Sequence, residues 1–207
     1  MPRHVSYYFS LISPWSYLGH HEFSTVARKH DLAIHYKPVT LPELFPQSGG
    51  LPLAKRHPSR QDYRMMELQR WREKRQVPMQ LRPKFWPFDP ELGDRVVIAL
   101  AAAELPVENF LPRAFAATFE NDQNLADEKV LAALLTGAGI DAAAILQQAK
   151  NEVSAAVYAA NLQEAVDNAV FGAPTYLLDG EVFWGQDRIG FLDAALTSGR
   201  QAFRADV

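Results

Sequence analysis

The feature that most limits the possible folds is the separation of strand-type from helix-type sequence along the chain. Runs typical of strands lie only near the two ends, at residues 5–11, 31–38, 175–178 and 181–184. Between the first two runs, Ser13-Pro14 is a strong helix start, because Ser is a favoured N-cap and Pro a favoured first helical residue. This β-α-β opening predicts two parallel strands joined by a right-handed crossover. Asp179-Gly180 predicts a tight hairpin turn between the last two strands.

The middle of the chain favours helices. Residues 60–170 are dominated by Ala, Leu, Glu, Gln and Arg, and breaks at proline and glycine divide them into five or six expected helices. Apolar residues at helical spacing predict two buried stripes, formed by Val130, Leu131, Leu134 and Leu135, and by Leu162, Ala165, Val166, Ala169 and Val170. Residues 40–59 are rich in Pro and Gly and are expected to form a loop, whereas 187–197 are expected to form the last helix. We therefore predict an α/β domain, built from 1–59 and 171–207, that carries a large all-helical insertion at 60–170.

Composition narrows the possible functions. A chain of 207 residues suits one domain, and its net charge of −3 argues against nucleic acid or an anionic membrane as the main partner. We find no signal peptide and no run of about 20 apolar residues, so we expect a cytoplasmic protein without a membrane span. The absence of Cys excludes a disulfide, a thiolate metal site and a Cys nucleophile within these residues. Any thiol chemistry would therefore need a sulfur from another molecule.

The first candidate for chemistry is Ser13, in the segment Ser13-Pro14-Trp15-Ser16. A helix N-terminus presents free N–H groups and the positive end of the helix dipole, and so favours an anion. A thiolate is such an anion, and thiol pKa values fall at helix N-termini. The simpler interpretation is that Ser13 only caps its helix.

The second candidate is Phe171-Gly172-Ala173-Pro174-Thr175, which directly precedes an expected strand. A cis Ala173-Pro174 bond would turn the backbone of Ala173 outward, where it could pair with an extended ligand. The alternative is an ordinary proline at the first residue of a strand, where no backbone donor is needed.

Three segments together resemble a known family. They are Tyr8 to Gly19, with Ser13-Pro14-Trp15-Ser16-Tyr17-Leu18; Phe171 to Thr175, which is similar to an F-G-x-P-T cis-proline element; and Phe183 to Arg188, which is similar to F-W-G-x-D-R. With the order of elements, they resemble the kappa-class glutathione transferases and 2-hydroxychromene-2-carboxylate isomerases of the DsbA-like superfamily. The resemblance extends over nearly the whole chain and implies a thioredoxin-like fold with a helical insertion.

The resemblance also implies a cofactor, glutathione, and roles for single residues. Ser13 would hold the glutathione sulfur as a thiolate, and Ala173, before Pro174, would exchange backbone hydrogen bonds with the cysteinyl part. Gln186 and Asp187 would bind the γ-glutamyl end, although Asp187 could simply satisfy a helix dipole. Arg60 would contact a glutathione carboxylate, or else be a solvated Arg at a helix start. The implied assembly is a homodimer, and the implied partner is a small-molecule substrate.

Two departures from the family pattern concern the same site. Gly50 stands where the family has Asn, and Ser10 stands where it has an acid after the first strand's Phe. Loss of the Asn could shift the substrate or weaken glutathione binding. The leading hypothesis is a glutathione-dependent isomerase of an aromatic-derived carboxylate, in which the thiolate adds to the substrate, permits ring opening and bond rotation, and leaves. A kappa-type transferase would use the same site, a non-catalytic thioredoxin-like binding protein is the rival, and the lack of Cys argues against a disulfide oxidoreductase.

Two further groups have ordinary explanations beside functional ones. The basic cluster, formed by Lys55, Arg56, His57, Arg60 and Arg64, could attract an anionic substrate or be a solvated surface. The aromatic group, formed by Trp71, Phe85, Trp86 and Phe88, could line a substrate pocket or pack in the core. The adjacent His20 and His21 point in different directions on a helix, so no metal site is expected there.

Overall fold

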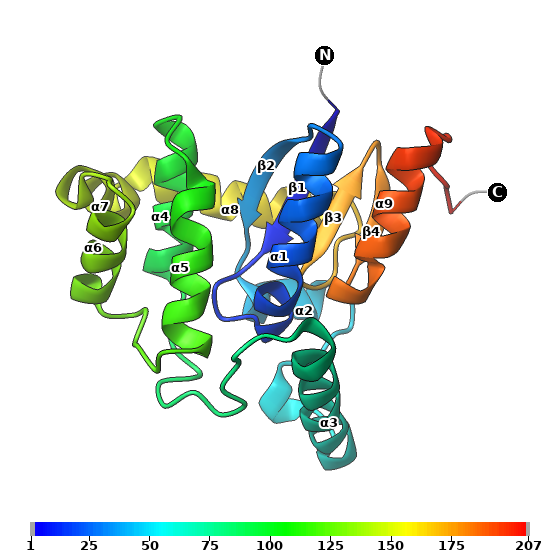
Figure 1. Cartoon of the computed structure of the whole chain (residues 1–207), viewed down its shortest axis with the longest axis horizontal. Helices are drawn as coiled ribbons and strands as arrows, with labels where there is room; N and C mark the ends of the chain where they lie inside the picture. The colour runs from blue at the N-terminus through cyan, green and yellow to red at the C-terminus, as the bar shows by residue number, and fades with distance from the viewer. Residues whose placement is uncertain (1–2, 206–207) are drawn as a thin grey trace.

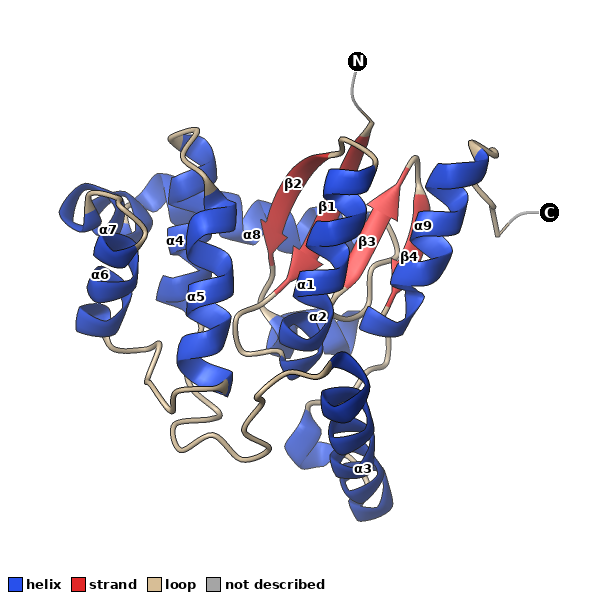
Figure 2. Ribbon diagram, in the orientation of Figure 1, coloured by secondary structure: helices blue, strands red, loops and turns tan. Residues whose placement is uncertain are grey.

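The computed structural model describes residues 3–205 of the chain. Its centre is a four-stranded mixed sheet (Figure 2). The spatial order of the strands is β2-β1-β3-β4. The central strand β1 (His4–Phe9) pairs in parallel with β2 (Ala33–Pro38) and antiparallel with β3 (Thr175–Leu178). The last strand, β4 (Glu181–Trp184), forms the expected hairpin with β3. Asp179 and Gly180 have φ of 52° and 82°, as a primed turn requires. This confirms the predicted thioredoxin-like order of elements.

Helices cover both faces of the sheet (Figure 1). One face carries α1 (Pro14–Lys29) and α9 (Ile189–Ser198), which pack against each other. Behind the sheet in this view lie α2 (Leu41–Gln47) and α8 (Glu152–Asp167), which also pack together. The alternation of β1 fits this layering, because Tyr7 and Phe9 join the main core while Tyr8 joins the smaller cluster under α2 and α8.

Aromatic side chains fill the core between the sheet and α1. The ring of Tyr7 stacks on Phe9, with ring centres 4.6 Å apart, and on Tyr176, at 5.3 Å. Phe23 of α1 completes the group at 4.5 Å from Tyr176. All four side chains are fully buried, so this aromatic group packs α1 against β1 and β3.

Among the described residues, six helices run from α3 to α8, in line with the five or six that the sequence predicted for 60–170. They are α3 (Pro58–Arg75), α4 (Glu91–Ala102), α5 (Val107–Phe119), α6 (Glu128–Gly137), α7 (Ala142–Lys150) and α8. The first of them, α3, lies apart from α4 to α7 in Figure 1 and packs on α1 instead. Leu131 and Leu135 are fully buried, as expected, whereas Ala169 is exposed with φ of 55° and lies outside its predicted stripe. None of the helices within residues 3–205 is long and apolar enough to cross a membrane.

Several predicted boundaries were wrong. The segment 40–59 is not only a loop, because it contains α2 and a short 3₁₀ turn at Leu53–Lys55. Its prolines hid α2, yet Pro42 lies in the first helical turn, where no intrahelical N–H is needed. The first strand ends at Phe9 rather than 11, and the second begins at Ala33 because Asp31 has φ of 49°. The last helix begins as a 3₁₀ turn, η2 (Gln186–Arg188).

Candidate functional site

Ser13 is the N-cap of α1, at the end of the turn that follows β1. Its Oγ accepts a hydrogen bond from the Ser16 N–H at 3.2 Å, and its own N–H donates to the Ser10 carbonyl at 3.0 Å. The side chain is 4% exposed. The Ser13 hydroxyl also lies 3.5 Å from the Ala173 carbonyl oxygen, a long contact that its proton can make. The serine therefore caps its helix and also faces the proline-containing loop.

A buried carboxyl group holds the turn that presents Ser13. Asp94, near the start of α4, accepts hydrogen bonds from Ser10 Oγ at 2.7 Å, from the Leu11 N–H at 2.9 Å and from Tyr158 Oη at 3.1 Å. Burial raises the pKa of Asp94 to about 7, although these three donors act in the opposite direction. A carboxyl group therefore does contact position 10, but it comes from α4 and not from β1.

The second predicted element has the geometry that the resemblance implied. The Ala173-Pro174 peptide bond is cis, and the ladder between β1 and β3 begins one residue later, at Thr175. The Thr175 hydroxyl donates to the Gly172 carbonyl at 2.7 Å, and the Gly185 N–H donates to the Pro174 carbonyl at 2.9 Å. This loop is therefore fixed from both sides, beside the N-terminus of α1.

A cavity of about 280 Å³ opens beside this loop. We call it the Asp187 cavity, and its lining residues are Trp15, Glu67, Trp71, Ala173, Pro174, Trp184, Gly185, Gln186, Asp187 and Arg188. A neighbouring cavity of about 430 Å³, the Arg60 cavity, is lined by Phe45, Ser48, Gly49, Gly50, Leu51, Arg56, His57, Arg60, Phe171 and Trp184. Trp184 lines both, so one indole separates them. A Cβ at Gly172 would lie 2.6 Å from the Trp184 Nε1, so only glycine leaves room for this indole.

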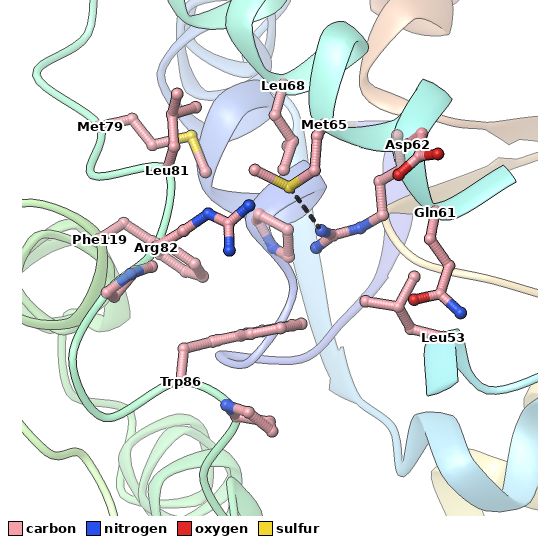
Figure 3. Close-up of a pocket in the computed structure, with 14 residues that line it drawn as sticks. Leu53, Gln61, Asp62, Met65, Leu68, Met79, Leu81, Arg82, Trp86 and Phe119 are labelled. Atoms are coloured by element: carbon pink, nitrogen blue, oxygen red, sulfur yellow. Dashed lines mark hydrogen bonds between the residues drawn. The ribbon is translucent and has the colours of Figure 1, made fainter. Parts of the chain in front are cut away.

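A third cavity, of about 400 Å³, is shown in Figure 3. We call it the Trp86 cavity. Pro14 lines it, whereas Trp15 lines the Asp187 cavity. The indole of Trp86 is tied to the turn before Ser13, because its Nε1–H donates to the Ile12 carbonyl at 2.9 Å. The helix start at Ser13 thus separates two different cavities.

Gln186 and Asp187, in the 3₁₀ turn before α9, line the Asp187 cavity. Gln186 is 3% exposed, and its Oε1 accepts two hydrogen bonds from Arg75, at 2.9 and 3.2 Å. Arg75 also donates to the Gln186 backbone carbonyl at 2.9 Å and forms an ion pair with Glu22. The Asp187 carboxylate lies 3.1 Å from the Arg188 guanidinium.

The structure therefore brings Ala173, Pro174, Gln186 and Asp187 into the lining of one cavity. Ser13 does not line it but lies 3.5 Å from the Ala173 carbonyl oxygen. Arg60 does not join them, because it lies in the neighbouring cavity behind Trp184. Gly50 lies in that neighbouring cavity too, so the departure from the family pattern falls beside Arg60.

Sequence reasoning missed three polar residues of the site, Asp94, Arg75 and Arg82. Asp94 stands in the first turn of α4 and is indistinguishable in sequence from an acid that stabilises the helix dipole. Arg75 stands in the last turn of α3, which is an ordinary place for a cation. Arg82 lies in the loop after α3. No local pattern marks any of them.

Two named relatives align with almost the whole length of this chain. A protein of Sphingobium xenophagum named 2-hydroxychromene-2-carboxylate isomerase is 28% identical over 198 residues, which cover 95% of this chain and 99% of the relative. A protein of the same name from Pseudomonas putida is 25% identical over 193 residues, covering 93% of each chain.

Solved structures show the same fold. A 2-hydroxychromene-2-carboxylate isomerase superposes with a TM-score of 0.76 at 24% identity, covering 94% of this chain and 95% of the other. A probable DsbA oxidoreductase from Streptomyces coelicolor superposes with a TM-score of 0.77 at 16% identity, covering 99% and 94%. Residues 4–197 match the family described as the DSBA-like thioredoxin domain, and the chain therefore belongs to that family.

Proposed function

We propose that this chain is a glutathione-dependent isomerase of an aromatic-derived carboxylate, of the 2-hydroxychromene-2-carboxylate type. The observation that carries the proposal is the position of the Ser13 hydroxyl at the N-terminus of α1, 3.5 Å from the Ala173 carbonyl oxygen, where the next two residues, Pro14 and Trp15, line two different cavities. The names and near-complete coverage of the relatives support the reaction type. Glutathione, when bound, supplies the thiolate nucleophile that a chain without Cys lacks.

The residues around Ser13 fit glutathione by their chemistry. An α-ammonium group suits the Asp187 carboxylate, and an extended cysteinyl backbone suits the loop edge at Ala173 and Pro174. Gln186 lines the same cavity and is held in place by Arg75. A carboxylate at the far end of the tripeptide suits Arg60, with Arg56 and His57 beside it. Trp184 lines both cavities that hold these groups, so an elongated ligand with charged groups at both ends would pass this indole to reach both.

Ser13 is the residue to which we assign thiolate stabilisation. Its Oγ already accepts from the Ser16 N–H, so its own proton is available to a neighbouring acceptor. In this structure the nearest acceptor is the Ala173 carbonyl, at 3.5 Å, which is too long for a strong bond. A thiolate beside Ala173 would be a better acceptor because it is charged, and α1 directs the positive end of its dipole to the same point.

The test is the pKa of the bound thiol. We expect glutathione bound to the protein to ionise well below the ordinary thiol value of about 8.5. Ser13→Ala removes one hydrogen bond to a charged group, of about 1.5–3 kcal/mol, and should raise that pKa by about 1–2 units. Ser16→Ala is the matched control, because it removes a hydroxyl from the same helical turn but keeps the Ser16 N–H. The measurement is thiolate absorbance across pH 5 to 9.

The outcomes separate the possible functions. Binding of glutathione with no pKa difference between Ser13→Ala and Ser16→Ala would contradict the assigned role of Ser13. No binding at millimolar glutathione would contradict the whole proposal and favour a non-catalytic binding protein. Product analysis separates an isomerase from a kappa-type transferase, since the isomerase returns free glutathione and the transferase leaves it on the product.

We also propose a homodimer and a cytoplasmic location, where reduced glutathione is abundant. The dimer is supported by an exposed apolar surface formed by the edge strand β4, by α9 and by the segment that follows α9. There, Trp184, Phe191 and Phe203 are 50%, 62% and 69% exposed around a hollow of about 700 Å³. Apolar patches of this kind mark interaction surfaces. A single monomer-sized species in sedimentation velocity would contradict the dimer.

A further inference from the structure

Positive charge is concentrated in one segment of the chain, residues 55–84, which we call the basic segment. It contains ten Lys and Arg residues but only three Asp and Glu residues, so its net charge is +7. The rest of the chain contains eleven Lys and Arg residues and twenty-one Asp and Glu residues, a net charge of −10. The small overall charge of −3 is therefore the sum of one strongly positive segment and a strongly negative remainder.

The basic segment lies beside every cavity of the candidate site. It includes α3, which lies apart from α4 to α7 in Figure 1. Arg60 of this helix lines the Arg60 cavity, Arg64 lines the Trp86 cavity, and Trp71 lines the Asp187 cavity. One charged helix thus contributes to all three cavities.

Most cations of the basic segment have no carboxylate partner. Of its ten Lys and Arg residues, only Arg70 and Arg75 form ion pairs within residues 3–205, with Glu67 and Glu22. By contrast, seven of the eleven Lys and Arg residues outside the segment form ion pairs. Cations elsewhere are therefore mostly neutralised by a neighbour, whereas the field of the basic segment extends into the solvent around the site.

Helix stability does not explain the cations at the start of α3. The N-terminal turn of a helix favours acidic residues, yet that of α3 contains none and carries Arg60. Partial burial, and then the neighbouring Arg60, lower the pKa of Arg56, because like charges disfavour the charged form. This crowding opposes folding, so attraction of an anionic ligand accounts for it better than stability does.

We propose that the basic segment is an electrostatic guide that concentrates small anions at the candidate site and speeds the binding of anionic ligands. For glutathione, this rests on the proposed function. The guiding cations are exposed, have no carboxylate partner in the described part of the chain and line none of the three cavities; they are Lys55, Arg72, Lys74 and Lys84. A small anion suits this guide better than a nucleic acid does, because an extended polyanion would also meet the net charge of −10 on the rest of the chain.

Tryptophan fluorescence measures how readily an anion reaches the site. All four Trp residues of the chain line these cavities: Trp15, Trp71, Trp86 and Trp184. The probe is quenching by iodide, and the reference is quenching by acrylamide, which is neutral. Raising the ionic strength from about 0.01 M to about 0.15 M shortens the Debye length from about 30 Å to about 8 Å. We expect iodide quenching to fall about threefold, as for a loss of about one kT of attraction, while acrylamide quenching stays the same.

Charge reversal tests the guide directly. Lys55→Glu with Lys84→Glu lowers the charge of the basic segment from +7 to +3 and changes no residue that lines the three cavities. Arg113→Glu with Lys129→Glu is the matched control, because it makes the same charge change at exposed residues of α5 and α6. At low ionic strength, the first variant should show about threefold weaker iodide quenching than the control. Stopped-flow fluorescence should show slower association of glutathione by a similar factor, with an unchanged dissociation rate.

The results distinguish this inference from the proposed function. Equal iodide quenching in the two variants, or equal rates of glutathione association, would overturn the inference even if bound glutathione ionises as proposed. Iodide quenching that depends on Lys55 and Lys84, in a chain that binds no glutathione, would support the guide and refute the proposed function. Binding of a single-stranded oligonucleotide at an ionic strength of about 0.15 M would overturn the assignment to small anions.

Discussion

The buried carboxyl group of Asp94 should make the stability of the folded chain depend on pH. It lies beneath the turn that presents Ser13 and is fully buried. Burial raises its pKa from the ordinary 3.8 to about 7, and the nearby Asp89 acts in the same direction. In an unfolded chain the same group has its ordinary pKa. The folded chain therefore binds more protons than the unfolded chain between these two values.

The direction and size of the pH dependence of stability follow from the difference between the folded and unfolded pKa of Asp94. The folded state is favoured most below pH 3.8, and this contribution is lost as the pH rises through about 7. At about 1.4 kcal/mol for each pH unit, the whole contribution is about 4 kcal/mol. Between pH 5 and 8, about 2–3 kcal/mol of it should be lost.

Asp94→Asn should remove this dependence while keeping the local hydrogen bonds. The Asn oxygen can accept from the Leu11 N–H, and its amide N–H groups can donate to the hydroxyls of Ser10 and Tyr158, which rotate to accept. The substitution therefore removes the titrating group and leaves the donors partnered. At pH 8 we expect the variant to be more stable than the unmodified chain.

Urea unfolding at pH 5 and at pH 8, followed by circular dichroism, measures the effect. The unmodified chain should lose about 2–3 kcal/mol more between these pH values than Asp94→Asn. Asp141→Asn is the control, because it removes the carboxylate of an exposed N-cap and keeps a residue that caps well. If the pH dependence of Asp94→Asn equalled that of Asp141→Asn, the buried, raised-pKa carboxyl would be refuted.

Two further predictions concern packing. Gly19→Ala places a Cβ 2.7 Å from the Gln186 Cβ and 3.3 Å from its Cα, so η2 must move. The free energy of unfolding, measured by thermal unfolding, should fall by about 1–3 kcal/mol. Calorimetry should show weaker glutathione binding. Unchanged affinity would mean that η2 does not hold the ligand. Leu135→Ala removes a fully buried side chain of α6 and should lower the free energy of unfolding by about 2–5 kcal/mol, while the pKa of bound glutathione stays the same. A shifted thiol pKa would show that the α6 layer also shapes the Ser13 site.

The fold could be predicted because its signals are local. The Ser13-Pro14 helix start, the Asp179-Gly180 turn and the apolar alternation of the strands each depend on a few consecutive residues. The short helix α2 was missed because it contains two prolines, Pro42 in its first turn and Pro46 inside the helix, and such a composition is typical of a loop. Boundaries such as the start of β2 depend on a single backbone angle at Asp31, which no side-chain pattern reveals.

The site residues that could be predicted are likewise those that belong to local motifs. Ser13 and the cis Ala173-Pro174 bond belong to short motifs and were predicted, although their approach to 3.5 Å is a tertiary fact. Asp94 meets Leu11 across 83 positions of the chain, and Arg75 meets Gln186 across 111. Such pairs leave no trace in local spacing, because the fold alone decides which helix end meets which turn.

The geometry of α1 explains why residues at one helix start line two different cavities. Successive helical residues point about 100° apart, so Pro14 and Trp15 face different sides although they are adjacent in sequence. Pro14 lines the Trp86 cavity and Trp15 lines the Asp187 cavity. Ser13 precedes both, where the unpaired N–H groups of the first turn are directed. In the proposed reaction, glutathione in the Asp187 cavity and an acceptor in the Trp86 cavity would approach the Ser13 hydroxyl from different sides.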